Sequence, residues 1–172
     1  SAVKEYGAMK AIAVVPYFAY ARQDKRFLEG EAVTAALLAK LIGEAGADAF
    51  MTVDAHSIDS TRGFTIPVMN VDASPVVSEK LLEMKLDGAS VVAPDEGALD
   101  RARSLARSLS GEAFSMRKSR DRTTGKIVMA DADFDVSGKN VVIFDDVIST
   151  GGTVTEGIKI LRRHNPSRIV VA

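Results

Sequence analysis

The 172-residue sequence contains no cysteine and no tryptophan, and aromatic residues make up only 6% of it. The absence of cysteine excludes disulfides, thiol nucleophiles and cysteine-ligated metals, and it is compatible with a reducing compartment. Neither sign of charge is in excess, because 22 lysines and arginines face 23 aspartates and glutamates. This balance provides no general attraction to nucleic acid or to an anionic membrane, so any binding of anions must be local.

Long apolar runs are also missing, since none approaches the roughly 18 residues of a membrane span, and no signal-peptide pattern opens the chain. What is present is a set of short apolar runs, at residues 11–15, 49–53, 91–93, 141–144 and 169–171. Continuous apolar runs of this length predict strands buried on both faces, as in a parallel sheet covered by helices.

The segments between these runs show helical spacing of apolar residues. Three stripes stand out: Val33, Leu37 and Leu41; Leu99, Ala102, Leu105 and Leu109; and Val154, Ile158 and Leu161. Helices that alternate with buried strands predict an α/β fold with right-handed crossovers. Polar residues follow successive strands, and in an open parallel sheet ligands bind at the carboxyl ends of the strands.

The segment 141–153 reads VVIFDDVISTGGT, which is a buried strand, two acids and a glycine loop that opens a helix. Glycines let the backbone approach an anion, hydroxyls add donors, and the helix turns its positive end to the same place. No lysine follows the glycines, so this is not a Walker A loop. Asp145 and Asp146 suit a ligand that also carries hydroxyls or bound Mg²⁺, and a phosphorylated sugar fits this description.

This loop resembles the phosphoribosyl-pyrophosphate loop of type I phosphoribosyltransferases and of ribose-phosphate pyrophosphokinases. Four other segments resemble the second family, in the family's order: YFAYARQDKRF at 17–27, VDAHS at 53–57, APDEG at 93–97 and RKSR at 117–120. Ala98 stands where that family usually has a second glycine. The resemblance covers the whole chain.

The resemblance implies a parallel-sheet, type I phosphoribosyltransferase-like α/β fold with two tandem similar halves, both incomplete. Residues 1–68 would be the C-terminal part of the first half, and residues 69–172 most of the second half. The family's N-terminal strand, its F-x-D-G-E loop and its last strands have no counterpart in the sequence. We therefore expect a central portion of a longer subunit, with activity in the longer chain.

The resemblance also implies a reaction in which Mg²⁺-bound ATP and ribose 5-phosphate give phosphoribosyl pyrophosphate and AMP. The expected ATP-binding residues are Arg22, Gln23 and Asp24, the metal-binding residues are His56 and Asp95, and the catalytic residues are Lys118 and Arg120. Ribose 5-phosphate would be bound by Asp145, Asp146, Ser149, Thr150, Gly151, Gly152 and Thr153. The implied enzyme is cytoplasmic, is a homo-oligomer built from dimers, and binds neither nucleic acid nor membrane.

Simpler interpretations of the same residues stay open. A lone histidine such as His56 is more often structural than a ligand, and a basic run such as 117–126 is ordinarily a solvated loop. Tyr17, Phe18 and Tyr20 beside Arg22 form a platform suited to a purine ring, or are core residues, which is the stronger alternative for Phe18. A phosphoribosyltransferase would share the loop at 145–153, and a regulatory homologue would keep the fold without catalysis.

Overall fold

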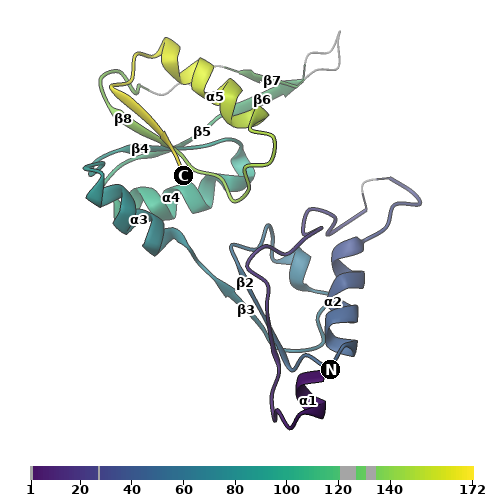
Figure 1. Cartoon of the computed structure of the whole chain (residues 1–172). Helices are drawn as coiled ribbons and strands as arrows, with labels where there is room; N and C mark the ends of the chain where they lie inside the picture. Colours follow the sequence, from purple (N-terminus) through teal and green to yellow (C-terminus); the bar gives the residue numbers. More distant parts are fainter. Residues whose placement is uncertain (1, 27, 121–126, 131–134) are drawn as a thin grey trace. The chain divides into compact units, whose positions relative to one another are not determined.

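The computed structural model describes residues 2–26, 28–120, 127–130 and 135–172, with backbone alone at 117–120 and 127–130. The chain forms two compact units, Ser1–Ala73 and Ser74–Ala172. Each contains a parallel sheet and helices, which confirms the predicted α/β class (Figure 1). No helix in the described part of the chain has the length and apolar character needed to cross a membrane.

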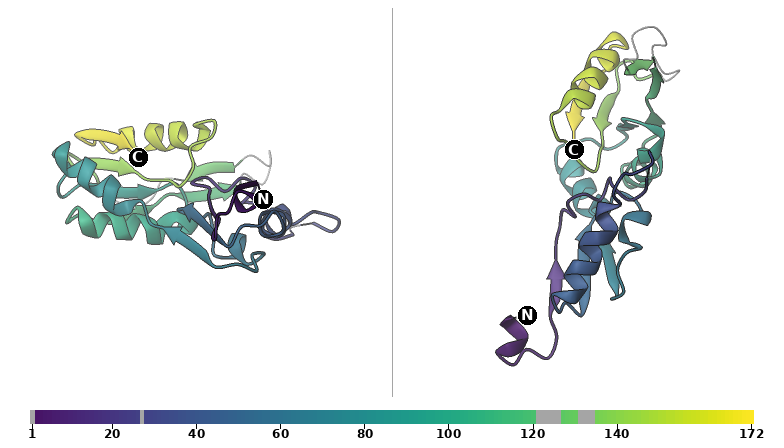
Figure 2. Two further views of the ribbon diagram at one scale, coloured as in Figure 1. Left: turned by 60° about the horizontal axis from the view of Figure 1, so that its bottom comes forward. Right: turned by 90° about the vertical axis from the view of Figure 1, so that its right-hand side faces the viewer.

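The first unit is a three-stranded parallel sheet with one helix packed on it. Its elements are α1 (Ala2–Glu5), β1 (Ile12–Val14), α2 (Thr34–Glu44), β2 (Ala49–Val53), the short 3₁₀ helix η1 (Asp59–Thr61) and β3 (Val68–Val71). The strand order is β1-β2-β3, with all pairs parallel. The right-hand view of Figure 2 shows α2 lying along one face of these strands.

Three phenylalanines form the centre of the first unit. Phe18 and Phe50 meet edge to face with ring centroids 5.2 Å apart, and Phe64 stacks on Phe50 at 4.1 Å. Phe18 and Phe50 are almost completely buried, together with Ala21 and Ala35. Phe18 is therefore a core residue, whereas Tyr17 and Tyr20 are exposed.

Helix α2 buries a different face from the one that the spacing predicted. The residues that it buries are Ala35 and Ala39, while Leu37 and Leu41 of the predicted stripe are 56% and 49% exposed. The stripe prediction was wrong here, because the core-facing side of the helix also includes Leu38 and Ile42, one position away from Leu37 and Leu41. At Gly63, a Cβ atom would lie only 2.6 Å from the backbone of Ala36.

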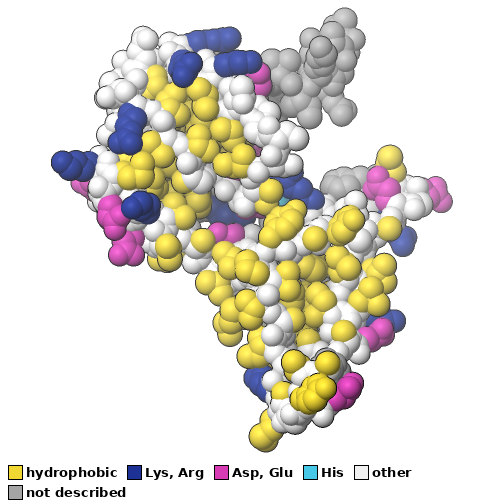
Figure 3. Space-filling model, in the orientation of Figure 1, with side chains coloured by type: hydrophobic (Ala, Val, Ile, Leu, Met, Phe, Trp, Pro, Cys, Tyr) yellow, Lys and Arg dark blue, Asp and Glu magenta, His cyan; other side chains and the backbone are white. Residues whose placement is uncertain are grey.

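The face of the first sheet that points away from Phe50 is apolar and exposed. Alternation along the strands places Ile12, Val14, Met69 and Val71 on this face, and they are 39–59% exposed. Hydrophobic side chains are prominent on the surface of this unit in Figure 3. Burial on both faces, which the continuous apolar runs predicted, does not hold for β1.

The second unit is a four-stranded parallel sheet between helices, with a separate hairpin. Its elements are α3 (Ser74–Glu83), β4 (Ser90–Ala93), η2 (Glu96–Ala98), α4 (Leu99–Ser108), β5 (Ala113–Ser115), β6 (Arg117–Arg120), β7 (Ile127–Ala130), β8 (Asn140–Ile143), α5 (Gly152–Arg163) and β9 (Arg168–Val171). The order is β5-β4-β8-β9, and β6 and β7 pair antiparallel. Figure 2, left, shows α5 on one side of the sheet and α3 and α4 on the other.

The strands at the centre of the second sheet are buried on both faces. Every residue of β4 is buried, and so are the last three residues of β8. One cluster packs Leu105 of α4 and Leu109, which follows the helix, against Val91, and the other packs Val154 and Leu161 of α5 against Val141. The two helical stripes predicted here are thus confirmed, and β4 and β8 end side by side.

Candidate functional site

The loop between β8 and α5 has the geometry of an anion-binding turn. Gly151 has a φ of +74°, a left-handed conformation that suits glycine, and α5 begins at Gly152. The Gly151 carbonyl accepts the first helical hydrogen bond, from Thr155 N–H at 2.8 Å. Ser149, Thr150, Gly152 and Thr153 are exposed, so their donors and the positive end of the helix are open to a ligand.

Three carboxylates gather next to this loop, at the ends of β4 and β8. Burial, together with a hydrogen bond to Asp146 and the negative charge of that residue, raises the pKa of the Asp145 carboxyl to about 6, and Asp95 makes a smaller contribution. The backbone N–H of Asp146 donates to Asp145 Oδ1 at 2.9 Å, and Ala98 N–H donates to Asp95 Oδ1 at 3.3 Å. Asp145 can therefore exchange a proton close to neutral pH.

Asp146 has a cationic partner that sequence reasoning did not find. Arg101 of α4 places Nη1 3.2 Å from Asp146 Oδ2, and the Asp146 side chain is only 3% exposed. The available signal was the position of Arg101 in the first turn of a helix, where a positive charge opposes the helix dipole. Only the packing of α4 beside β8 reveals its partner.

In the first unit, the structure joins two of the segments that the sequence singled out. Ser57 Oγ donates to Asp24 Oδ2 at 2.5 Å, across 33 residues of sequence. Arg22 and Gln23, together with Lys25, Glu31 and Ala32, line a cavity of about 240 Å³. Tyr20, two residues before Arg22, is exposed and has a φ of +63°.

His56 lies in the loop after β2, next to Ser57, and is half-buried. The loop is held by Asp54, which has a φ of +43° and accepts a hydrogen bond from Ala73 N–H at 3.3 Å. Ala55 N–H donates to Asn70 Oδ1 at 2.9 Å. His56 and Asp95, the two expected metal ligands, belong to different compact units.

The expected catalytic residues Lys118 and Arg120 have their backbone in β6, paired with Met129 and Ile127 of β7. Their side chains lie outside the described part of the structure. Within the part that is described, no group of three or more acidic or histidine side chains could hold a metal ion by itself. The carboxylates beside the loop thus form no complete metal cage.

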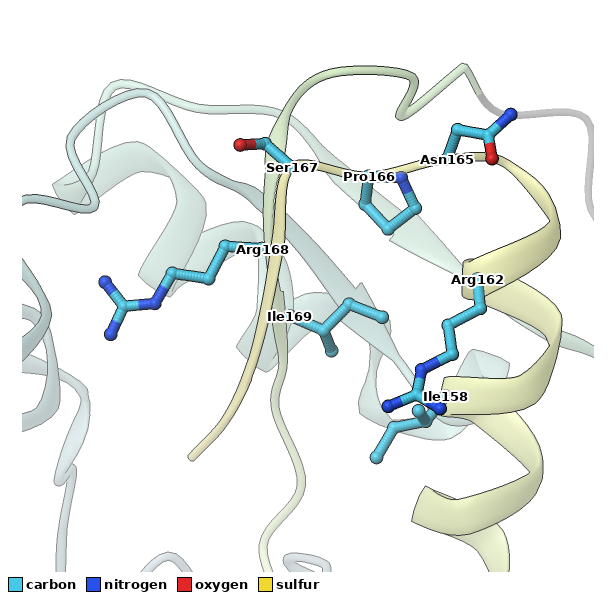
Figure 4. A pocket seen from close by; sticks show the side chains of 7 residues that line it. All are labelled: Ile158, Arg162, Asn165, Pro166, Ser167, Arg168 and Ile169. Carbon is cyan, nitrogen blue, oxygen red and sulfur yellow. The ribbon is translucent and has the colours of Figure 1, made fainter.

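A larger cavity, of about 430 Å³, lies at the opposite end of α5, between its last turn and the start of β9. Figure 4 shows that Arg162 extends toward Ile158, whereas Arg168 points away from it on the other side of β9. Arg168 Nη1 donates to the carbonyl of Met84 at 3.3 Å. These two arginines do not converge on one point of this cavity.

Two family models match the chain. Residues 78–172 match the phosphoribosyl transferase domain, and residues 1–46 match the N-terminal domain of ribose phosphate pyrophosphokinase. A ribose-phosphate pyrophosphokinase from Methanothermobacter thermautotrophicus is 39% identical over 98% of this chain and 58% of its own. One from Saccharolobus solfataricus is 36% identical over 92% of this chain and 54% of its own.

A solved structure gives the same result for the fold. The crystal structure of a phosphoribosylpyrophosphate synthetase from Mycobacterium smegmatis superposes with a TM-score of 0.85 at 31% identity, covering 99% of this chain and 55% of that one. The phosphoribosyltransferase-like fold expected from the sequence is thereby confirmed. The chain spans about half of the length of these relatives.

Proposed function

Because the chain belongs to the phosphoribosyl transferase domain family, we propose that it carries the site for diphosphoryl transfer from ATP to ribose 5-phosphate. The 1-hydroxyl oxygen of the sugar forms a bond to the β-phosphorus, the bond from that phosphorus to the α-phosphate oxygen breaks, and AMP leaves. The hydroxyl proton passes to water or to a nearby base. The products are phosphoribosyl pyrophosphate and AMP, which serve nucleotide biosynthesis.

The observation that carries this proposal is the pairing of carboxylates with an anion-binding loop at the end of β8. Asp145 and Asp146 accept hydrogen bonds from the sugar hydroxyls, because carboxylates are strong acceptors for such donors. The 5-phosphate binds to residues 149–153, whose exposed backbone and hydroxyl groups lie at the start of α5. The set comprises Ser149, Thr150, Gly151, Gly152 and Thr153.

ATP binds to the first unit, through Arg22, Gln23 and Asp24. The support is the cavity of about 240 Å³ lined by Arg22 and Gln23, and the match of residues 1–46 to the N-terminal domain of a pyrophosphokinase. Arginine suits this task, since its planar fork binds phosphate and stacks on aromatic rings. The match of residues 1–46 favours this proposal over a phosphoribosyltransferase, because such an enzyme would share only the loop at 145–153.

Mg²⁺ is the proposed cofactor, with His56 and Asp95 as protein contacts. Mg²⁺ keeps several waters and uses one or two carboxylates plus substrate phosphates, and Asp95 offers a carboxylate close to those of Asp145 and Asp146. When bound, the ion neutralises phosphate charge. Asp95, which follows β4, would hold it beside the sugar site.

Lys118 and Arg120 are the proposed catalytic residues, and their task is to stabilise the charge of the transferred group. They lie in a strand that leads away from Met116, which packs against the core under α5. We further propose that residues 1–68 and 69–172 are parts of two similar halves. We also propose that the protein forms a homo-oligomer built from dimers and that it is cytoplasmic.

The test is an assay for AMP with purified full-length protein, ATP, Mg²⁺ and ribose 5-phosphate. AMP that forms only when the sugar is present supports the proposal, and ³¹P spectra identify the diphosphate on carbon 1. Turnover that instead needs a nucleobase and preformed phosphoribosyl pyrophosphate points to a transferase. Inactivity in both assays, with the protein shown to be folded by circular dichroism, favours a regulatory homologue.

A further inference from the structure

Arg101 occupies a position that its helix does not favour. It is the third residue of α4, in the turn where backbone N–H groups make the end of the helix positive. Asp100, the residue before it, has the charge expected there, and it pairs with Arg103 on the surface at 3.0 Å. A cation at this place needs a compensating partner.

The partner of Arg101 is Asp146, in the loop that follows β8. Helix α4 follows β4, and β4 lies beside β8, so the first turn of α4 comes close to the residues that follow β8. Nη1 of Arg101 lies 3.2 Å from Asp146 Oδ2. The side chain of Arg101 is 26% exposed and that of Asp146 is 3% exposed, so water screens this ion pair weakly.

Arg101 and Asp146 are close enough for an ion pair, but a nitrogen of Arg101 is left without a hydrogen bond. Among the described residues, Nη1 of Arg101 is the buried side-chain nitrogen that lacks a hydrogen bond of good geometry. The ion pair therefore holds Asp146 by charge and leaves part of the donor capacity of the guanidinium unused. Buried polar atoms without a hydrogen bond are few in native structures, so each of them calls for an explanation.

We propose that Arg101 is a positioning residue for ribose 5-phosphate, which acts by holding and neutralising the carboxylate of Asp146 beside the phosphate loop. This role rests on the proposed function of the loop. Two carboxylates directly before a phosphate site repel the phosphate, and Arg101 offsets one of these charges. It also keeps an oxygen of Asp146 fixed where the sugar hydroxyls bind.

The experiment compares Arg101→Met, Arg101→Lys and Arg103→Met in the full-length protein. Arg103→Met is the matched control, since Arg103 lies on the same helix and pairs with an aspartate at the surface. The Kd of ribose 5-phosphate is measured by calorimetry without ATP, and KM is measured separately for each substrate. We expect Arg101→Met to raise Kd and KM for the sugar about tenfold, the size of a lost charge-assisted contact.

In the same experiment, KM for ATP stays within about twofold, Arg101→Lys recovers part of the sugar affinity, and Arg103→Met matches the wild type. Equal increases in both KM values would mark Arg101 as merely structural and would overturn the proposal. So would an unchanged Kd in folded Arg101→Met. A wild type that binds no ribose 5-phosphate refutes the function proposed for the loop, and the role of Arg101 falls with it.

A double variant separates an indirect role from a direct contact, and it covers the case in which Arg101→Met folds poorly. In the Asp146→Asn background no buried carboxylate is left unpaired, and Arg101→Met is expected to change the Kd of the sugar less than twofold. A tenfold effect that persists in that background means that Arg101 touches the sugar phosphate itself. That result would refute its action through Asp146.

Discussion

Replacing Asp145 by asparagine is expected to stabilise the folded protein at neutral pH. Burial and the interactions with Asp146 raise the pKa of Asp145 from 3.8 to about 6. The folded state therefore keeps a proton that the unfolded state has lost, and its stability falls as the pH rises from about 4 to about 6. The amide side chain of the variant would carry no charge, would keep the oxygen that accepts from Asp146 N–H, and would offer its NH₂ group to the Asp146 carboxylate.

The size of the effect follows from the pKa difference. A shift from 3.8 to about 6 corresponds to roughly 3 kcal/mol of destabilisation above pH 6. Because the residue is only partly buried, solvent screening reduces this to about 1–2 kcal/mol. Asp145→Asn should recover this amount, at the expense of a proposed contact with the sugar, as is common when an active site stores strain.

The assay is urea unfolding of wild type and variant at pH 8, 6 and 4, followed by circular dichroism. The variant should gain about 1–2 kcal/mol at pH 8, less at pH 6 and almost nothing at pH 4. Asp87→Asn, on an exposed turn before β4, is the control and should change stability by less than about 0.5 kcal/mol. A variant that is not stabilised at pH 8, or whose gain persists at pH 4, would refute the reasoning.

Three further outcomes are expected. A hydrogen bond from Lys4 lowers the pKa of Asp48, so Lys4→Met should move the Asp48 titration observed by NMR to higher pH; an unmoved titration contradicts the contact. In calorimetric melts, Phe50→Ala should lower the free energy of unfolding by about 3–5 kcal/mol and Leu37→Ala by under about 1 kcal/mol. Similar losses for both variants would mean that Leu37 faces the core, as its spacing predicted. Lys118→Ala should keep the melting temperature and lose most of the AMP formation, and unchanged turnover would remove Lys118 from the catalytic role.

The second unit was largely predictable because its central strands, β4 and β8, are buried on both faces. A strand such as β8 has apolar residues at successive positions, so its run is visible without knowledge of the fold. The buried faces of α4 and α5 were also predictable from the sequence, since each helix packs bulky residues on one face. The loop at 149–153 was predictable because its glycines, its hydroxyl residues and the start of the helix lie within a few residues of one another in the sequence.

The first unit was less predictable, because large apolar residues occur on more than one side of its helix. Ala35 and Ala39 are buried and Leu38 and Ile42 pack beside them, whereas Leu37 and Leu41, which have the same spacing, are exposed. Strand β3, at Val68–Val71, contains an asparagine and is exposed throughout, so no apolar run marks it. Its place is set by pairing with β2, which is a contact between distant parts of the chain.

The sequence by itself determined the class of the fold, the glycine loop before α5 and the acids that precede it, since each depends on neighbouring residues. Only the tertiary structure decided which charges surround these acids. Arg101 is 45 positions from Asp146, and the two meet because α4 follows β4, the strand that pairs with β8. The raised pKa of Asp145 has both origins, because burial and the small contribution of Asp95 arise from packing, whereas the larger contribution of Asp146 comes from the next residue in the sequence.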